Sequence, residues 1–409
     1  MSSILTNNSA MVALQSLQSV NSNLAKTQDM ISTGKAVGSA KDNAAVFAIS
    51  KVMESDVSGF KAISDSLSLG ESTVAVGRQA AETTTDLLKE IKGKIVGAQE
   101  ENVDRAKIQT DIGQLRDQIA SVVGAAQFNG LNFVDGSSTE TVDVLASLDR
   151  DSAGTVTAGQ ISVSRQDLSQ TVMGAGATDA TGVGSGNAIA AGASGTVVTF
   201  AQPPAAGETY QVNSGALVGT DTGNALSADV VYVASEGDTL ADVNKEMATR
   251  LNVQAAKDGI DVTFSVDGDD IVMQNNSGEE ITADQTEFVE GDGSALDGTV
   301  GGKMDLLAGI DVSTKEGAAA GLVAIESLLQ KSIDSSAAFG SAEKRIEIQS
   351  DFVGKLTDAL TSGIGSLVDA NMEEASARLQ ALQVQQQLAT QSLSIANQAP
   401  QALLSLFRG

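Results

Sequence analysis

The two ends of the chain carry heptad-like patterns, and these patterns constrain its fold more than any other feature. In each pattern, apolar or small residues recur at alternating steps of three and four, which is the seam of helices packed side by side in a coil. The N-terminal seam comprises Ala10, Ala13, Leu17, Val20, Leu24, Thr27 and Ile31, and the C-terminal seam comprises Val368, Met372, Ala375, Leu379, Leu382, Gln386, Ala389, Leu393 and Ala396. A second C-terminal stripe of Val384, Leu388 and Ile395 predicts that this helix packs against more than one neighbour.

Both ends also carry very few charges. Residues 1–40 hold one acidic and two basic side chains, and residues 370–409 hold two of each sign. The exposed surface of a monomeric helix is normally rich in charge, so we expect both ends to be surrounded by protein, including further copies of the chain. The predicted self-assembly interface consists of Ala10, Ala13, Leu17, Val20, Leu24, Ile31, Leu379, Leu382, Leu388, Leu393 and Ala396. The alternative is an ordinary helix pair that closes a single domain.

Composition excludes several classes of chemistry. The chain has no Cys, His or Trp, which removes thiol and imidazole catalysis and metal sites built from Cys or His, so we expect no cofactor and no enzymatic activity. A serine or carboxylate enzyme remains formally possible. The net charge of −27 argues against nucleic acid and anionic membranes as partners. No apolar run reaches the ~18 residues of a membrane span, and residues 1–8 lack the charged and apolar regions of a cleaved secretory signal.

Long helical patterns lie between the two terminal seams. Three-four spacing runs over residues 60–95, over 108–126 and, with one slip, over 322–360, and it predicts long helices there. The second of these patterns stops at the turn signal Phe128-Asn129-Gly130. Glycines within residues 34–38 and 363–365 predict hinges that separate these inner helices from the terminal seams.

The centre of the chain differs in both charge and pattern. Residues 135–303 hold 26 acidic and 6 basic side chains. Short β-type runs predict strands at 196–200, 208–212, 229–233, 261–266 and 270–273, and residues 239–256 predict one amphipathic helix. The expected fold class is mainly α, with long coiled helical hairpins at both termini and a small α+β insert in the centre. We expect three parts: a terminal coiled-coil domain (1–41 and 366–409), a helical domain (42–140 and 304–365) and a variable, surface-exposed α+β insert (141–303).

Two short central motifs have both a functional and a structural interpretation. Gly237-Asp238-Thr239-Leu240 resembles the start of a LysM carbohydrate-binding module, but such residues are also a common helix cap, which is the interpretation we favour. Asp267, Asp269 and Asp270 suggest a calcium site, yet they lack the spacing and the terminal Glu of an EF-hand loop. A solvated hairpin tip is therefore the better hypothesis for these three residues.

Motifs at both ends resemble those of bacterial flagellins. Ser32-Thr33-Gly34-Lys35, the run Ser39-Ala40-Lys41-Asp42-Asn43-Ala44-Ala45 and the Phe128-Asn129-Gly130 turn resemble the N-terminal signature of that family. Residues 396–406 are similar to the flagellin C-terminus. The resemblance covers roughly residues 1–135 and 305–409, and two unrelated signatures in the right order make it specific.

This resemblance implies a structural subunit that polymerises into the flagellar filament, exported unfolded by the flagellar type III secretion apparatus to the outside of the cell. The terminal domain would form an inner tube, the helical domain an outer tube, and the insert would face solvent. The implied partners are other flagellin subunits, an export chaperone, the filament cap and hook-junction proteins. One alternative is a hook–filament junction protein, which shares the end signatures. Another is a flagellin with a metalloprotease insert, which needs His-Glu-x-x-His, and the chain has no His.

One segment departs from the family pattern. Many flagellins carry Gln-Arg-Val-Arg-Glu-Leu-Ala-Val-Gln on the second half of the long inner helix, a surface that a vertebrate Toll-like receptor recognises. The aligned segment here is 89–97, and its departures are Glu90 and Lys92 for the two arginines, Gly93 for the Glu and Lys94 for the Leu. A charge reversal and the loss of an apolar anchor predict weak recognition by that receptor.

Overall fold

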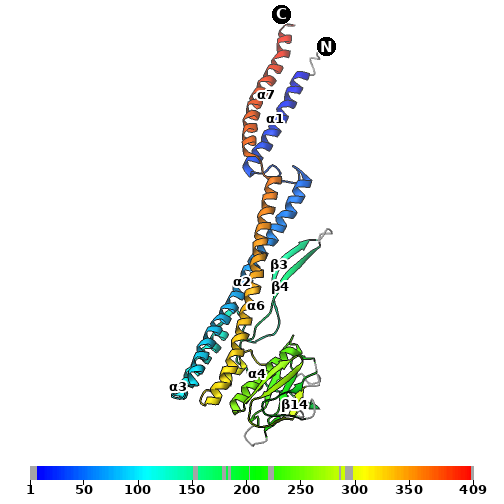
Figure 1. Ribbon diagram of the computed structural model, residues 1–409. Helices are drawn as coiled ribbons and strands as arrows, with labels where there is room; N and C mark the ends of the chain where they lie inside the picture. The colour runs from blue at the N-terminus through cyan, green and yellow to red at the C-terminus, as the bar shows by residue number, and fades with distance from the viewer. Residues whose placement is uncertain are drawn as a thin grey trace. The chain divides into compact units, whose positions relative to one another are not determined.

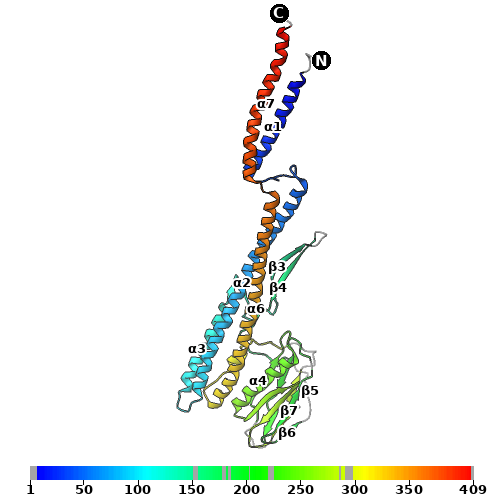
Figure 2. The same cartoon turned by 45° about the horizontal axis from the view of Figure 1, so that its top comes forward.

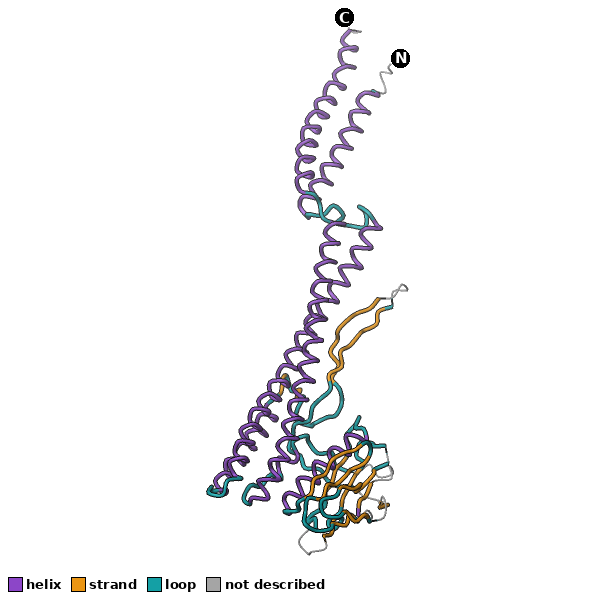
Figure 3. Tube along the Cα trace, viewed as in Figure 1, coloured by secondary structure: helices purple, strands orange, loops and turns teal. Residues whose placement is uncertain are grey.

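The computed structural model describes residues 7–150, 155–176, 181–182, 186–201, 203–219, 225–284, 287–290 and 298–406, with the backbone alone for residues 181–182 and 399–406. The chain forms two compact units. The first comprises Met1–Asp65, Ser147–Gly159 and Gln349–Gly409, and the second comprises Ser66–Ala146 and Gln160–Ile348. Long helices run through both units, and the strands are concentrated in the middle of the sequence (Figure 1, Figure 3). The prediction of a mainly α fold with a central α+β insert is confirmed.

The long helices agree with the predicted helical patterns. They are α1 (Asn8–Thr33), α2 (Ala44–Ala98), α3 (Arg105–Ala125), α6 (Lys315–Val368) and α7 (Met372–Leu406), and a short helix, α5 (Asp305–Ala308), precedes α6. The predicted break at residues 363–365 is wrong, because α6 continues through both glycines. A glycine inside a helix costs only about 1 kcal/mol, which packing can offset. The helix ends instead at Val368, just before Asn371 caps α7 by accepting hydrogen bonds from the backbone N–H groups of Glu373 and Glu374.

The loop at residues 34–43 is non-helical, as the glycines there predict. Gly34 follows the last residue of α1 with a φ of 69°, the left-handed conformation in which glycine commonly ends a helix. The Ala36 N–H donates to the Val368 carbonyl at 2.7 Å, and the Ala370 N–H donates to the Gly34 carbonyl at 2.9 Å. These bonds join the loop after α1 to the segment between α6 and α7, so the inner ends of both terminal helices are fixed together.

Helices α2, α3 and α6 form the helical core of the second unit. Their buried residues include Leu67, Val74, Ala81, Leu88, Ile91 and Ile95 from α2, Ile112, Ile119 and Val123 from α3, and Ile325, Leu328, Phe339 and Ile346 from α6. The Arg78 guanidinium bonds to Glu343 at 2.6 Å, and the hydroxyl groups of Thr85 and Ser332 lie 2.9 Å apart. Since rising numbers on α2 meet falling numbers on α6, the two helices run antiparallel.

Two small β-ribbons follow α3. Strands β1 (Gln127–Phe128) and β2 (Leu131–Asn132) pair around Asn129 and Gly130, which have φ values of 50° and 81°, so the predicted turn is confirmed. Strands β3 (Val142–Arg150) and β4 (Val156–Val163) form a separate two-stranded sheet. This second ribbon was not among the predicted elements, although buried and exposed residues partly alternate along β3.

The central domain, which we define as residues 174–299, contains antiparallel sheets and one helix, α4 (Leu240–Asp258). Among the described residues, one sheet has the order β10-β8-β14-β5, a second β11-β12-β7 and a third β6-β13-β9. The strands are β5 (Thr181–Gly182), β6 (Asn187–Ile189), β7 (Ser194–Thr199), β8 (Thr209–Val212), β9 (Leu217–Gly219), β10 (Val230–Val233), β11 (Val262–Asp267), β12 (Asp270–Asn275), β13 (Ile281–Ala283) and β14 (Phe288–Glu290). All five predicted central strands and the predicted helix are confirmed.

The central domain has its own hydrophobic core. Its buried cluster is drawn entirely from residues 189–288, with Phe200, Tyr210 and Phe288 fully buried. Helix α4 lies against the strands (Figure 2) and contributes Met247 and Leu251, both at 0% exposure. The domain therefore buries its apolar side chains without help from the long helices.

Candidate assembly interface

Helices α1 and α7 lie side by side and run antiparallel (Figure 1, Figure 2). The Asn7 side-chain amide donates to the Ala396 carbonyl at 2.8 Å, and the Gln386 amide donates to the Asn21 side-chain oxygen at 2.8 Å. At the inner end of the pair, residues 35 and 369 form an isolated antiparallel bridge. Polar contacts at the two ends and in the middle thus fix the register of this pair.

The structure brings the two predicted seams together. Every N-terminal seam residue is buried or half-buried, whereas most residues between them are exposed. On α7, Ala375 and Leu382 are buried, and Leu379, Gln386, Ala389, Leu393 and Ala396 are half-buried. Met372 of the seam is exposed, and so are all three residues of the second stripe, Val384, Leu388 and Ile395. Each helix therefore buries a single narrow stripe against the other.

Large apolar side chains on the outer faces of this helix pair are left exposed by the residues that the structure describes. On α7 they are Val384, Leu388 and Ile395, with 54%, 57% and 63% of their surface exposed. On α1 they are Met11, Val12 and Leu14, with 58%, 64% and 45% exposed. Val384, Leu388 and Ile395 are four and seven residues apart and so share one face of α7, and such an exposed apolar stripe is typical of a protein–protein contact.

The α1 part of this surface was missed by the sequence analysis. Met11 and Leu14 are three residues apart, which is itself a helical spacing, but they lie outside the predicted seam. A search for a second apolar stripe on the N-terminal helix, of the kind found at Val384, Leu388 and Ile395, would have found them.

The run from Ser39 to Ala45 in the loop after α1 has a structural role. The Ser39 hydroxyl and backbone N–H both donate to the Asp42 carboxylate at 3.0 Å, and these bonds lower the pKa of Asp42. Asn43 accepts a hydrogen bond from the Val46 N–H at 3.3 Å at the start of α2. The run therefore builds the turn between α1 and α2.

Four residues of segment 89–97 that differ from the family's receptor-binding pattern lie on α2 in the second unit. Lys92 forms an ion pair with Glu326 of α6, and Lys94 forms one with Asp111 of α3 at 2.7 Å. The hydrogen bond to Asp111 raises the pKa of Lys94. Glu90 and Gly93 are exposed. Both lysines thus form ion pairs with neighbouring helices, while Glu90 places a negative charge in solvent.

The two weak central motifs have defined local structure. Thr239 caps α4: its hydroxyl accepts from the Asp242 N–H, and the Asp242 carboxylate accepts from the Thr239 N–H at 2.9 Å. Residues 267–270 form the tip of the β11–β12 hairpin, as predicted, with residues 267–269 exposed and Asp270 half-buried. In the described part of the chain, no cluster of three or more acidic residues has the arrangement of a metal site. No helix there combines the length and apolar content that a membrane crossing requires.

Both terminal regions of the chain match known protein families. The family model of the bacterial flagellin N-terminal helical region matches residues 4–139, and that of the C-terminal helical region matches residues 322–407. Flagellin A of Rhizobium meliloti is 34% identical over 426 residues, which cover all of both chains. Among solved structures, FliC from Burkholderia pseudomallei covers 68% of this chain and 99% of its own, with 15% identity and a TM-score of 0.33. The flagellar hook associated protein-3 from Legionella pneumophila covers 78% and 98%, with 11% identity and a TM-score of 0.39.

A pair of packed terminal helices whose described residues leave apolar side chains exposed is a feature typical of subunits that assemble with further protein. The chain belongs to the bacterial flagellin family, because both family regions match and a full-length relative is 34% identical. It is a subunit of the bacterial flagellar filament.

Proposed function

We propose that α1 and α7 form the self-assembly interface of this filament subunit. The observation that carries this proposal is the exposed apolar face of the terminal pair, on which Leu388 and Ile395 are more than half exposed. Neighbouring subunits would cover this face, and the predicted seam residues Ala10, Ala13, Leu17, Val20, Leu24, Ile31, Leu379, Leu382, Leu393 and Ala396 would hold each pair together inside the assembly.

The proposal includes a layered arrangement in the filament. Residues 1–41 and 366–409 would form the inner tube, residues 42–140 and 304–365 the outer tube, and residues 141–303 the solvent-facing surface. Charge supports this order, because residues 135–303 hold 26 acidic and 6 basic side chains, while residues 1–40 hold only three charged side chains. So many like charges at a packed interface would repel one another, whereas at the surface water and salt screen them.

Family membership supports a further part of the proposal. The subunit would leave the cell unfolded through the flagellar type III apparatus, without signal cleavage, and function in the extracellular filament. An export chaperone, the filament cap and hook-junction proteins would be its transient partners. Secretion assays in cells with and without a functional export apparatus test this part: the chain should reach the medium only when the apparatus works.

We also propose that the chain has no enzymatic role and is not a hook–filament junction protein. Flagellin A of Rhizobium meliloti, a relative that covers the full length of the chain, is a flagellin, which favours the filament subunit. The chain has no His or Cys for the metalloprotease chemistry considered above. Copy number decides between the two structural roles, since a filament subunit should be present all along the filament and a junction protein only at its base.

Deletion of residues 372–409 tests the assembly proposal. The truncated chain lacks all of α7, so we expect a soluble, partly helical monomer that does not elongate seeds of the full chain. Sedimentation and negative-stain electron microscopy measure the result, with the full chain as the control. Normal filaments from the truncated chain would exclude α7 as an essential part of the interface.

A further inference from the structure

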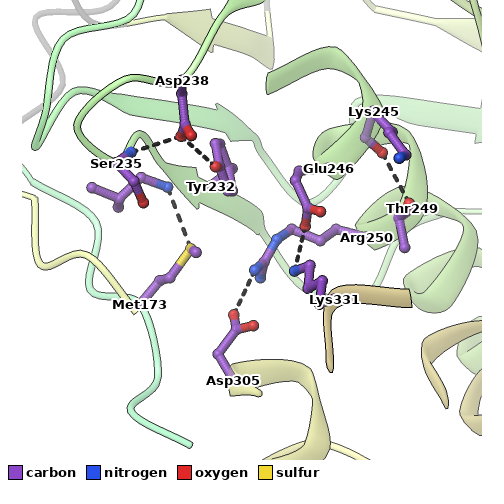
Figure 4. A network of polar contacts seen from close by, with 11 residues as sticks. Met173, Tyr232, Ser235, Asp238, Lys245, Glu246, Thr249, Arg250, Asp305 and Lys331 are labelled. Carbon is purple, nitrogen blue, oxygen red and sulfur yellow. Dashed lines mark hydrogen bonds and ion pairs between the residues drawn. The ribbon is translucent and has the colours of Figure 1, made fainter. Parts of the chain in front are cut away.

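Two ion pairs connect the central domain to the helices of the second unit. Arg250 of α4 contacts Asp305 of α5 at 2.5 Å, and Glu246, one helical turn away on α4, contacts Lys331 of α6 at 2.8 Å. Figure 4 shows both pairs pointing across from α4 to these helices. We name these four residues the charge clamp. The side chains of Arg250 and Asp305 are 9% and 3% exposed, and those of Lys331 and Glu246 are 18% and 16% exposed, so solvent screens neither pair strongly.

The chain enters and leaves the central domain through two connectors that lie side by side. Backbone hydrogen bonds pair residues 167–174 with residues 299–304: the Lys303 N–H donates to the Asp167 carbonyl at 2.9 Å and the Gly302 N–H to the Thr171 carbonyl at 2.9 Å. A Cβ atom at Gly302 would lie 2.0 Å from the Ser169 carbonyl oxygen, so only glycine allows this pairing. The connectors therefore form a tight ribbon.

Apolar packing at the junction is incomplete. A cavity of about 540 Å³ lies next to the Arg250–Asp305 pair, and its other lining residues include Val172, Val230, Val253, Leu306, Ile310 and Ala324. The central domain already has a complete core of its own. Beside this cavity, the two ion pairs bridge from α4 to α5 and α6, and together with the connectors they limit the orientation of the central domain.

The Arg250–Asp305 pair is also incompletely satisfied. The Arg250 Nε and Asp305 Oδ1 atoms are buried and have no hydrogen-bond partner among the described residues. A buried ion pair with a leftover donor and acceptor adds little net stability, because its desolvation is not fully compensated. Separating the two charges while either stays buried is strongly unfavourable. The pair thus selects one docked arrangement over alternative ones.

We propose that the charge clamp holds the central domain in one orientation on α5 and α6, and that this single orientation is lost when the clamp is broken. While both ion pairs are formed, the central domain is held rigidly. When they are broken, the domain remains folded and attached through the paired connectors, but it samples several orientations. This inference concerns the single chain and does not depend on filament assembly.

Distance measurements between spin labels on the full-length monomer test the proposal. The chain has no Cys, so Ser265→Cys on β11 and Ala337→Cys on α6 introduce two unique, exposed attachment sites. We expect one narrow distance distribution for the labelled wild-type background. Lys331→Glu places a negative charge opposite Glu246 and should broaden the distribution about twofold or more, as expected when several orientations become comparably populated. The charge swap Lys331→Glu with Glu246→Lys should restore the narrow peak.

A matched control separates the clamp from a general effect of charge. Lys89→Glu makes the same change on α2, where Lys89 pairs with Asp86 in an exposed ion pair, and it should leave the distribution narrow. Circular dichroism confirms that each variant folds, and Lys331→Gln, which adds no repulsion, serves if Lys331→Glu does not fold. A broad distribution in the wild-type background, or a narrow one in every folded Lys331 variant, would overturn the proposal.

Discussion

The terminal helix pair and the central domain differ in how much of their hydrophobic surface is buried within one chain. In the central domain, α4 and the sheets enclose a core in which Tyr210, Phe264 and Leu251 are almost fully buried. In the terminal pair, α1 has one buried residue, Thr27, and the described part of α7 has two, Ala375 and Leu382. The central domain can thus bury its hydrophobic residues by itself, whereas the terminal pair needs further protein to bury its own.

Charge separates the same two regions. The terminal sequences have few of the charged residues that make an exposed helix soluble, and the central sequence has many acidic residues. This difference suggests that the ability to assemble and the surface properties of the filament are encoded in separate parts of the chain. Changes in one region should therefore leave the function of the other intact.

The largest effect is expected for Leu388→Glu. Leu388 is 57% exposed in the single chain, so the monomer should keep its helical content and thermal stability. In a filament, the new carboxylate would be buried without a partner at a cost of several kcal/mol in every copy, so filaments should not form. Seeded polymerisation followed by light scattering measures this outcome. Leu388→Met is the matched control and should polymerise normally. Polymerisation of Leu388→Glu at the wild-type rate would show that this face is not part of the interface.

A smaller effect concerns the helical surface at residues 89–97, which belongs to neither of the two compared regions. Glu90 and Lys94 replace an Arg and a Leu of the family pattern, and each change should cost roughly 2 kcal/mol at a binding hot spot. Together they predict an affinity for the vertebrate Toll-like receptor at least about a thousandfold lower. Receptor reporter cells treated with nanomolar monomer should respond weakly or not at all. Restoring the family residues at 90, 93 and 94 should raise the response, and a full response to the unmodified chain would contradict the prediction.

The smallest effect is expected at Gly34, which sets the exit of the chain from α1. Its φ of 69° is strained for a residue with a Cβ atom, so Gly34→Ala should cost about 1–2 kcal/mol. Amide hydrogen exchange in α1 and α7 should then accelerate by roughly 5- to 30-fold. Gly38→Ala is the matched control, because the added Cβ would meet no atom within 4 Å and Gly38 is not among the described residues with positive φ. Equal exchange in both variants would show that this loop does not control the terminal pair.

The sequence predicted the helices and the seam well, because periodicity reports directly on which side of a helix is buried. It also indicated that Leu388 belongs to a stripe apart from the seam. It failed at residues 363–365, where the packed helix overrides the weak helix propensity of glycine, and at β3–β4, whose short alternation was not recognised. It also missed the central strands β5, β6, β9, β13 and β14, because two or three residues are too short for a recognisable alternation. The charge clamp could not have been predicted, since Arg250 and Asp305 are 55 residues apart and no pattern links them.

Removal of the central domain tests the separation of the two regions most directly. Gly174 and Thr299 are joined by backbone hydrogen bonds of 3.1 and 2.8 Å, so a Gly-Gly linker can replace residues 175–298 and leave the paired connectors closed. We expect the shortened chain to polymerise into filaments that are thinner and less acidic at the surface, and the excised domain to fold by itself with a cooperative thermal transition. Electron microscopy and calorimetry measure the two halves of this result. A shortened chain that retains its helices by circular dichroism but forms no filaments would contradict the account.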